Sequence, residues 1–404
     1  MYCIKELISE KISGEWGSEP DESSSVKVLR TTNFTNSGVI NFEKVVQRNI
    51  SKLVVDKKRL QLGDVIIEKS GGSPTQPVGR VVYFDKDVEE PILCNNFTTI
   101  LRPNEKVFPK YFFYSLYANH LTGKTLKFQN KTTGIINLKL ERYLDEKIPL
   151  PPLSEQKRIA DILDKADSLR QKRKESIALL DELLKSVFID MFGDLVRNEK
   201  GWEVRRLGEV TESSNHAIKA GPFGSLLKKE FYVNDGYKIY GQEQVIRNDF
   251  KYGDYYISED RFKTLKQYEV KSNDVLISLV GTFGHISIVP DEFKRGIINP
   301  RLVKISLDRR KTLPEFFKCL LTTERMRKYL LSHSHGGTMG IINLRILKSL
   351  KLILPPIGVQ REFVDILKKS QIMRERMALS NAQLEFQFNA LLQRAFRGEA
   401  NDKK

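Results

Sequence analysis

The sequence contains one series of motifs twice. The two copies lie 204 to 206 positions apart, and self-similarity at a fixed spacing is the signature of a repeated structural unit. Because there are only two copies, each spanning about half of the chain, the sequence predicts a duplicated pair of domains and not a solenoid. The first series is Gly134–Lys139, Pro151–Gln156 and Asp161–Leu163, and the second is Gly340–Arg345, Pro355–Gln360 and Asp365–Leu367.

Four segments follow from this repeat. Residues 1–152 and 195–356 are mixed regions in which short β-rich runs alternate with turn-forming residues. The run Val275–Ile277 in the second region matches Val65–Ile67 in the first, and an aspartate precedes each run. Residues 153–194 and 357–404 are long helical patterns that follow double prolines, which can neither continue a strand nor lie inside a helix. The predicted fold class is α+β, with two similar mixed α/β domains separated by two long antiparallel helices in a pseudo-two-fold arrangement.

The helical segments carry apolar side chains three and four residues apart, which is the spacing of a coiled-coil seam. The first helix leads from one mixed region to the other and the second helix starts at the second region, so the two must run antiparallel if they pack along their length. Arg173 interrupts the predicted seam, and the run from Glu155 to Phe192 would be roughly 57 Å long as a helix. The seam residues are Ile159, Ile162, Leu169, Leu180 and Leu184 in the first helix and Phe363, Ile366, Met373, Leu384 and Phe388 in the second.

The charge balance indicates a polyanionic partner. The chain has 67 Lys and Arg against 51 Asp and Glu, a net charge of +16 that lies mostly in the two mixed regions, and such a balance favours nucleic acid. Three widely spaced cysteines form no CxxC pair, so neither a disulfide framework nor a zinc site is expected. A reducing cytoplasm is the simplest location, and no apolar run is long enough to predict a membrane span.

Several loops have the residue types that bind nucleic acid. Gly-rich, hydroxyl-bearing loops let backbone N–H groups and small donors approach phosphates or base edges, and glutamine can pair bidentately with adenine. Each loop alone is weak, but they recur at equivalent places in both halves. The candidates are Lys69, Ser70, Gly72, Ser73, Lys127, Gln129, Lys131 and Thr132 in the first half, and Ser225, Lys228, Lys229, Gln242, Gln244, Thr282, His285, Arg301, His333, His335 and Thr338 in the second.

The sequence offers no assembled catalytic centre. Asp64 and Glu68–Lys69 match a nuclease core only loosely, and Asn299–Leu302 is a faint echo of an amino-methyltransferase motif that lacks its second proline and its aromatic residue. His333 and His335 have no further ligand at metal spacing. Three alternatives to a binding subunit stay open: a stand-alone methyltransferase or nuclease, a coiled-coil scaffold without DNA specificity, and a stand-alone repressor.

Further motifs give the chain a family resemblance. Gly201–Glu203, Leu207–Val210 and Gly221–Ser225, together with the repeated motifs above, make it similar to the specificity subunit of a type I restriction-modification system. The N-terminus departs from the pattern: Tyr2 and Leu7 would stand for Trp202 and Leu207, and Glu15–Gly17 would replace the Gly-Pro-Phe-Gly turn. A second departure is Gly358-Val359 in place of Ser154-Glu155.

The resemblance implies a division of labour. Each mixed region would be a target recognition domain that reads one half of an asymmetric, bipartite DNA site. The two helices, through the seam residues named above, would bind two modification subunits, which hold S-adenosylmethionine and methylate adenine N6 after flipping the base. Restriction subunits would use ATP and Mg for translocation and cleavage. This chain would then have no catalytic residue, no metal and no cofactor of its own.

Overall fold

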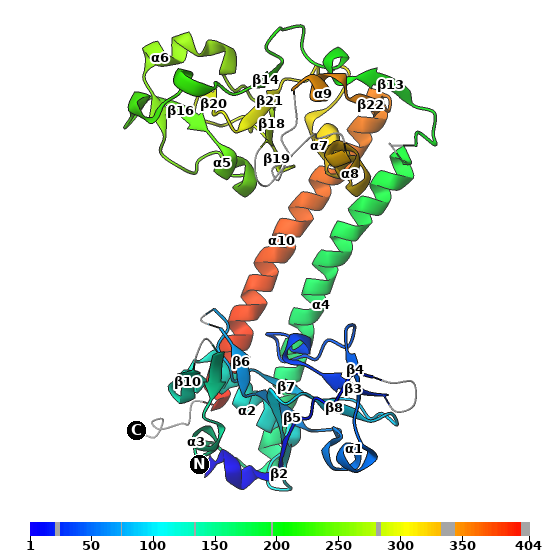
Figure 1. Ribbon diagram of the computed structural model, residues 1–404, viewed down its shortest axis with the longest axis vertical. Coiled ribbons are helices and arrows are strands. Elements are labelled where there is room, and N and C mark those ends of the chain that lie inside the picture. Colours follow the sequence, from blue (N-terminus) through cyan, green and yellow to red (C-terminus); the bar gives the residue numbers. More distant parts are fainter. Residues whose placement is uncertain are drawn as a thin grey trace. The chain divides into compact units, whose positions relative to one another are not determined.

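The computed structural model describes residues 1–20, 25–73, 75–132, 135–194, 197–279, 284–332 and 344–396. The chain divides into two compact units: unit 1 comprises Met1–Ser176 and Met377–Lys404, and unit 2 comprises Ile177–Arg376. The two long helices, α4 (Leu153–Phe192) and α10 (Ile357–Phe396), each give one half to each unit (Figure 1). The predicted helical segments are therefore helices, but they are part of the units and not separate bodies.

Unit 1 is built around a four-stranded antiparallel sheet. Its order is β2 (Ile8–Ser13), β9 (Thr98–Pro103), β5 (Val65–Glu68) and β7 (Val81–Tyr83), and all four residues of β5 are buried. A second sheet, β4-β3-β8, contains one parallel pair, β3 with β8. The other elements are β1 (Tyr2–Cys3), β3 (Ser25–Leu29), β4 (Val46–Asn49), α1 (Lys52–Lys58), β6 (Ser70–Gly72), β8 (Ile92–Cys94), α2 (Pro109–Leu121), β10 (Gln129–Thr132), β11 (Ile135–Leu138), α3 (Leu140–Leu144) and β12 (Lys147–Ile148).

Unit 2 repeats this plan. The sheet β14-β21-β18-β19 matches β2-β9-β5-β7, and the parallel pair β16 with β20 matches β3 with β8. Because β18 takes the place of β5, the predicted match of Val65–Ile67 with Val275–Ile277 is confirmed. The elements are β13 (Glu203–Arg206), β14 (Ile218–Ala220), β15 (Tyr232–Val233), β16 (Tyr237–Tyr240), α5 (Gln242–Arg247), β17 (Tyr256–Ile257), α6 (Glu259–Thr264), β18 (Val275–Ser278), β19 (Ile286–Ile288), β20 (Gly296–Ile298), β21 (Leu302–Ile305), α7 (Pro314–Thr322), α8 (Glu324–Ser332), α9 (Leu344–Ser349) and β22 (Lys351–Leu354).

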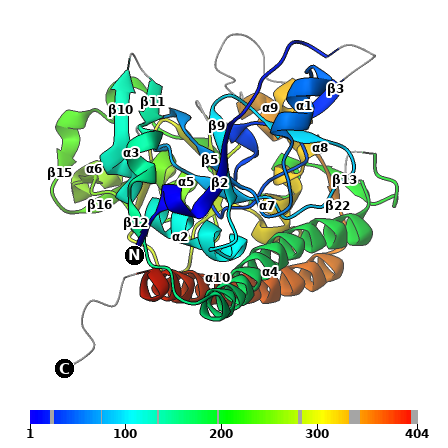
Figure 2. The same ribbon diagram turned by 90° about the horizontal axis from the view of Figure 1, so that it is seen from below.

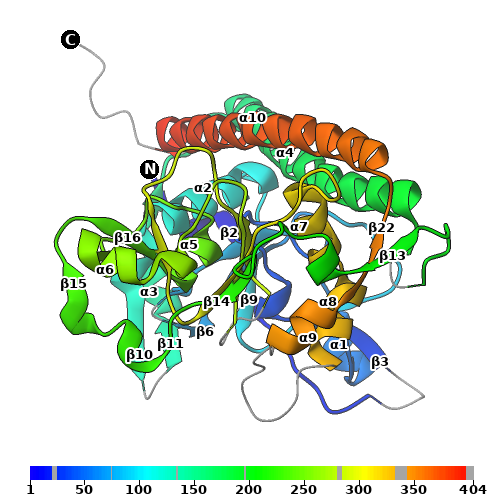
Figure 3. The same cartoon turned by 90° about the horizontal axis from the view of Figure 1, so that it is seen from above.

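In each unit one helix fills the space between the main sheet and the long helices. In unit 1 this helix is α2, which lies against α4 and α10 (Figure 2). Its aromatic side chains share a core with Leu163 of α4 and Phe388 of α10. In unit 2 it is α7, which lies beside α4 and α10 (Figure 3). Its Phe316 packs against Phe188 of α4, with Phe363 of α10 in the same core. The N-terminal half of one long helix thus meets the C-terminal half of the other in both units, which confirms the antiparallel pairing.

The repeated glutamine of the double-proline motif fixes the start of each long helix. Gln156 is buried; its Oε1 accepts from the Phe108 backbone N at 2.8 Å and its Nε2 donates to the Pro151 oxygen at 2.8 Å. Gln360 makes the same two bonds, with Leu313 N at 3.0 Å and Pro355 O at 2.8 Å. Since a buried amide left unpaired is costly, this residue ties the helix start to the turn that opens α2 or α7.

The predicted seam is correct only in part. Ile162, Leu169, Ile366 and Met373 are exposed, so the prediction that they lie in the seam is wrong. The buried positions include Ala160, Leu163, Arg170, Val364 and Leu392, together with the predicted Leu180, Phe363 and Phe388, whereas Ile159, Leu184 and Leu384 are half-buried. The reason is that the first half of α4 faces α2 and α10 at once, so its buried face is rotated away from the simple two-helix stripe.

The structure also corrects the alignment of the two halves at the N-terminus. Ile4 N donates to Glu146 O and Leu207 N donates to Leu350 O, while Glu6 and Glu209 cap the two turns in the same way. Ile4 therefore stands for Leu207, and the predicted match of Tyr2 and Leu7 with Trp202 and Leu207 is wrong by three residues. The sequence comparison failed because it aligned side-chain types, whereas the register is set by backbone hydrogen bonds.

A glycine in each unit marks the same close approach of two backbones. A Cβ on Gly14 would overlap the Asn95 carbonyl oxygen, and a Cβ on Gly221 would overlap that of Asn299. Three residues later Gly17 and Gly224 both have positive φ, of 70° and 61°. Residues 14–17 thus form the same turn as residues 221–224, and only the two side chains between the glycines differ.

We expect Gly14→Ala and Gly221→Ala to destabilise units 1 and 2 respectively, by about 2 kcal/mol each, because backbone must move to admit the methyl group. Hydrogen exchange of the sheet amides in each unit would measure the loss. The control is Gly358→Ala in the first turn of α10, where a Cβ meets nothing within 4 Å; it should be neutral or slightly stabilising. Equal protection in all three variants would contradict the close approach.

Candidate nucleic-acid interface

In unit 1 the two predicted binding loops belong to one small sheet. Strands β10, β11 and β6 pair in that order, with Gln129 opposite Leu138 and Ser70 opposite Asn137. The Ser70 hydroxyl bonds the Asn137 side-chain oxygen at 2.5 Å, and Gln129 donates to Val78 O. Lys69, Ser70, Gly72, Ser73 and Gln129 are therefore brought together, Lys127 is exposed just before β10, and Lys131 and Thr132 are in β10.

Lys69 is the most unusual of these residues electrostatically. Its ammonium group is half-buried and donates to the Ser13 hydroxyl at 2.6 Å, beside the Gly14 turn. Burial lowers the pKa of Lys69, and the charges of Lys58 and Lys11 lower it further. Lys58 and Lys11 have carboxylate partners, but no described carboxylate forms an ion pair with Lys69. A half-buried cation without a counter-charge is suited to an anionic ligand such as phosphate.

In unit 2 three predicted residues gather at the end of β18. The Gln242 amide donates to the Ser278 hydroxyl at 2.6 Å, the Ser278 backbone N donates to His285 O, and Leu279 N donates to Arg301 O. The side chains of His285 and Arg301 are exposed. Ser225, Lys228 and Lys229 are exposed too, in the segment after the Gly221–Gly224 turn, where Lys228 pairs with Glu230. Thr282, His333, His335 and Thr338 lie outside the described residues.

Gln244 is not available to read a base. Its side chain is buried; Oε1 accepts from Gly241 N at 2.8 Å and Nε2 donates to Tyr252 O at 2.9 Å. Asn33 does the same in unit 1, where its Oδ1 accepts from Arg30 N at 2.9 Å. The expectation of adenine pairing by Gln244 therefore conflicts with the geometry, because both ends of the amide hold a turn. Only Gln242, two residues earlier, remains from that pair.

We call the candidate interface residues of each unit, described above, its rim. The sequence analysis did not predict two exposed aromatic side chains that lie at these rims. Phe97 lies two residues after Asn95 in unit 1, and Phe223 lies between the glycines of the Gly221–Gly224 turn in unit 2; their exposed fractions are 41% and 63%. Exposed aromatic rings beside a basic surface can stack on or wedge between bases. For Phe223 the signal was present in the sequence, since this ring lies in the Gly221–Ser225 motif.

The acidic residues considered for nuclease chemistry are bonded to other side chains within the fold. Asp64 accepts two hydrogen bonds from Arg102, and Glu68 accepts two from Arg80, all between 2.8 and 3.0 Å. Asp274, the counterpart of Asp64, is buried beside Ser306, and burial raises its pKa. Within the described part of the chain, no three His, Cys, Asp or Glu side chains are grouped to hold a metal ion, and no helix is long and apolar enough to cross a membrane.

The long helices also present apolar side chains to solvent. In unit 1 these include Ile162 and Leu169 of α4 and Leu379 and Phe386 of α10, and in unit 2 they include Leu179, Leu183, Ile366 and Met373. Leu379 and Phe386 are among the most exposed, at 69% and 76%, and they are seven residues apart on one helix. Side chains at this spacing lie on one face, so the helices carry apolar surface beyond what the described core uses.

The fold and this site define a protein with two repeated α+β units, each carrying a polar and aromatic rim. A family model, the type I restriction modification DNA specificity domain, matches residues 10–179 and again residues 199–385. Because the two matches cover most of both halves, the chain belongs to this family.

Individual relatives agree with the family. The MjaVIII specificity subunit of Methanocaldococcus jannaschii, from a type I restriction enzyme, is 26% identical over 304 residues, which cover 73% of this chain and 71% of that protein. The EcoBI specificity subunit of Escherichia coli is 24% identical over 98% of this chain and 90% of that protein. The crystal structure of a type I restriction-modification S subunit from M. genitalium has the same fold, with a TM-score of 0.55 at 16% identity, covering 100% of this chain and 96% of that chain.

Proposed function

We propose that this chain is the non-catalytic subunit that selects the DNA sequence in a type I restriction-modification complex. Each unit would read one half of an asymmetric, interrupted target with the rim residues described above. Lysine and arginine contacts to phosphate would supply most of the affinity, and side chains at the rim would supply the choice of sequence.

The observation that carries this proposal is that the same backbone frame presents different side chains in the two units. Lys69 and Leu279 occupy the same position, since both donate their backbone N to the equivalent turn residues Phe97 and Arg301. Trp16 and Phe223 are likewise equivalent, between paired glycines. Lys69 is half-buried beside Ser13, whereas Leu279 is buried in the core of unit 2. A protein that repeats a scaffold but places different side chains at corresponding positions is suited to recognising two different sites.

The exposed apolar side chains of α4 and α10 would bind two modification subunits, which would carry S-adenosylmethionine and methylate adenine. ATP and Mg would belong to restriction subunits where these are present. The stand-alone enzyme and the scaffold without DNA specificity are less favoured, because the carboxylates considered for catalysis are consumed by salt bridges and because of the family membership.

The direct test is the methylation pattern of the host genome. We expect one asymmetric, interrupted adenine motif that disappears when this gene is deleted and returns on complementation. The purified chain with methyl donor or Mg should show no activity, and a purified modification subunit should methylate the motif only when this chain is added. Methylation by the chain alone would favour the stand-alone enzyme.

Lys69→Met should weaken DNA binding by unit 1 about fivefold, and nearly equally for all sequences. It should also reduce the slope of log K against log salt by about one, because one phosphate contact is lost. Thermal stability should stay the same or rise, since an unpaired half-buried charge is removed. Fluorescence anisotropy at several salt concentrations measures both effects. The control is Lys147→Met, an exposed lysine of β12, and an unchanged slope for Lys69→Met would contradict the assignment.

A further inference from the structure

Each unit has two turns at its rim that hold each other in place. The first turn comprises residues 14–17 in unit 1 and 221–224 in unit 2, and the second comprises residues 95–97 and 299–301. Gly14 N donates to Thr98 O at 3.2 Å, directly after the second turn. Gly221 N donates to Leu302 O at 3.0 Å in the same way. Because backbone bonds and the close approach at these glycines fix both turns, the side chains on them keep a set place on the surface.

One of the two turns carries a bare aromatic ring in each unit, meaning a ring that is exposed and that no described cation covers. In unit 1 this ring is Phe97, on the second turn, and in unit 2 it is Phe223, on the first turn. Arg301 takes the place of Phe97 in unit 2. Trp16 takes the place of Phe223 in unit 1, but it is half-buried, and the guanidinium of Arg48 lies over its ring at 4.0 Å. The units therefore present one bare ring each, from turns that are not equivalent.

Phe97 is bonded directly to the segment that carries the Lys69 ammonium. The Phe97 carbonyl oxygen accepts from Lys69 N at 2.9 Å and from Ser70 N at 3.2 Å. A Cβ on Gly71 would lie 3.4 Å from the Phe97 ring, so this strand also borders the ring. The Lys69 ammonium reaches Ser13, the residue before the first turn. An aromatic face for a base and a cation for a phosphate thus lie together in unit 1.

Phe223 also has cations nearby in unit 2. Arg301 lies on the second turn, against which the first turn packs, and Lys229 follows six residues after Phe223. Both side chains are exposed, and neither forms an ion pair with a described residue. A Cβ on Gly224 would meet nothing within 4 Å, so the space beside Phe223 is open. Unit 2 therefore presents a bare ring beside cations as unit 1 does, but from the other turn.

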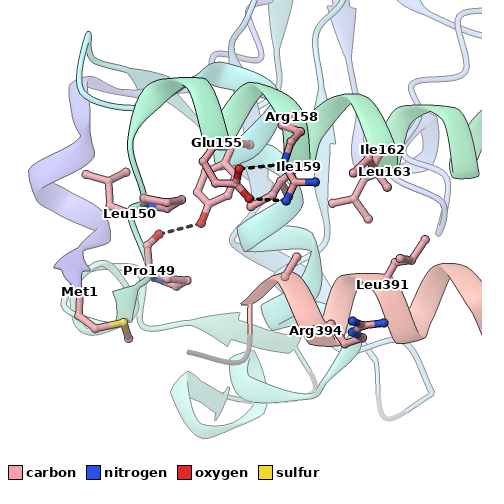
Figure 4. A pocket seen from close by; sticks show the side chains of 13 residues that line it. Met1, Pro149, Leu150, Glu155, Arg158, Ile159, Ile162, Leu163, Leu391 and Arg394 are labelled. Carbon is pink, nitrogen blue, oxygen red and sulfur yellow. Dashed lines mark hydrogen bonds and ion pairs between the residues drawn. The ribbon is translucent and has the colours of Figure 1, made fainter. Parts of the chain in front are cut away.

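An open groove elsewhere in unit 1 does not have this chemistry. It has a volume of about 940 Å³ and lies where α4 begins and α10 ends (Figure 4). Tyr111 is the one aromatic residue among those that line it; this side chain is buried, and its hydroxyl donates to Pro149 O at 3.0 Å. Arg158 in the groove pairs with Glu155 at 2.6 Å. The groove therefore offers no aromatic face to a base, unlike the turns at the rims.

A phenyl ring acts on duplex DNA through its faces and its bulk. It has no hydrogen-bond donor or acceptor, so it cannot read the polar pattern on base edges. Apolar wedges reach the covered base faces by entering between two base pairs and partly unstacking them. The cost of this opening depends on the sequence, and pyrimidine–purine steps such as TA and CA/TG open most easily. A bare ring on a fixed turn is therefore suited to selecting a flexible step.

We propose that Phe97 and Phe223 are specificity-determining residues, each of which wedges into one base step of the half-site that its unit reads. Each ring would favour a flexible step without bonding any base, while the neighbouring cations hold the phosphates beside it. Because the two rings lie on different turns, the opened step would fall at a different place in each half-site. This inference rests on the proposed function and adds to it how part of the sequence is chosen.

The first experiment uses the full chain and a duplex of the target found in the host methylome, with 2-aminopurine replacing each purine in turn. The fluorescence of this base rises when its neighbours unstack, and we expect a rise at one step in each half-site. Phe97→Ala should abolish the rise in one half-site and Phe223→Ala the rise in the other, whereas leucine at either position should keep most of it. The matched controls are Tyr2→Ala and Tyr255→Ala, exposed by 44% and 59%, which should change neither signal. Unchanged signals in both alanine variants of phenylalanine overturn the proposal.

The second experiment measures affinity by fluorescence anisotropy at several salt concentrations. Phe97→Ala and Phe223→Ala should each bind the target about tenfold more weakly, the usual effect of losing one base–aromatic contact. The slope of log K against log salt should stay the same, since no charge is lost, and this distinguishes the rings from Lys69. Replacing the opened step with a stiff one should weaken the original chain severalfold and the matching alanine variant hardly at all.

Two results would overturn the wedge. One is an affinity loss that uracil in place of thymine reproduces, because the ring would then be reading a thymine methyl group. The other is equal sensitivity of the original chain and the alanine variants to the stiff step. The proposed function fails separately, if the original chain binds no sequence in preference to others. Specific binding with unaltered signals in both alanine variants contradicts the wedge alone.

Discussion

Replacing residues 1–152 with the matching segment of another family member should change one half of the DNA target and leave the other half unchanged. The rim residues of unit 1 lie in that segment, whereas the β18 and β21 rim of unit 2 does not. Specific and non-specific DNA binding differ in affinity by about a thousandfold or more. The exchanged chain should therefore bind a target with the original first half-site about a thousandfold more weakly than the original chain does.

The measurement is binding to a library in which each half-site is randomised separately. The junction at residue 152 is chosen because Gln156 bonds only backbone atoms of the exchanged segment, at Phe108, Lys106 and Pro151, so side-chain differences there are tolerated. The reciprocal exchange of residues 203–354 is the control and should change the other half-site. If either exchange altered both half-sites, the modular assignment would fail.

Much of the architecture could be predicted from sequence because the repeat fixes it. The repeat shows that Val65–Ile67 and Val275–Ile277 are corresponding strands. The two long helices and their antiparallel direction follow from the two copies and from the order of segments along the chain. The double-proline motif was recognisable as a boundary. Its function was not, since only the structure shows that Gln156 and Gln360 tie each helix start to a neighbouring turn.

The site was predicted less well, for a physical reason. The loops were chosen by residue type, and type alone cannot distinguish a free side chain from one that holds a turn. Gln244 failed in this way, because both ends of its amide bond the backbone, whereas the DNA-binding roles of Lys69 and Gln242 stay predictions. Phe97 and Phe223 were missed because an exposed aromatic ring looks like a core residue in the sequence.

The helix seam shows that the spacing pattern of a single helix does not determine which of its residues are buried. A stripe with spacings of three and four predicts a two-helix seam, but α4 also packs on α2, and this third element rotates its buried face by one residue. Arg173, the predicted interruption, is only half-buried, and the charged residue inside the interface is Arg170. No single-helix pattern could distinguish these two arginines, because their difference depends on α10.

Arg170 should be the most sensitive position of the helix pair. Arg170 is 2% exposed. Its guanidinium bonds Asp167 and Glu385, the latter at 2.7 Å, and lies over the Phe388 ring at 3.8 Å. We expect Arg170→Met to destabilise unit 1 by about 3 kcal/mol, because two carboxylates lose their cation and Phe388 loses its cation–π contact. Hydrogen exchange of α2 and the first half of α4 would report the loss, and α7 in unit 2 should be unaffected.

The same network predicts a loss of stability in acid. Burial acts to raise the pKa of Glu385, but the hydrogen bond from Lys174 and the charge of Arg170 outweigh it, so this pKa is lowered from its usual 4.5. A depressed carboxylate pKa contributes stability above the unfolded-state value and loses it as the pH falls through the folded-state value. The stability of unit 1 should therefore decline below about pH 4.5, and the decline should be smaller in Glu385→Gln.

Two further variants decide whether the network acts as a pair. Arg173→Met, three residues along the same helix, should cost less than about 0.5 kcal/mol, as is usual for surface positions. Arg170→Met combined with Glu385→Leu should cost less than the two single changes added together, because residues in one ionic network are coupled. Unit 2 contains the counterpart pair Arg374 and Asp181, 3.1 Å apart but largely exposed, so Arg374→Met should have little effect. If Arg374→Met and Arg170→Met cost the same, burial is not what makes the Arg170 network matter.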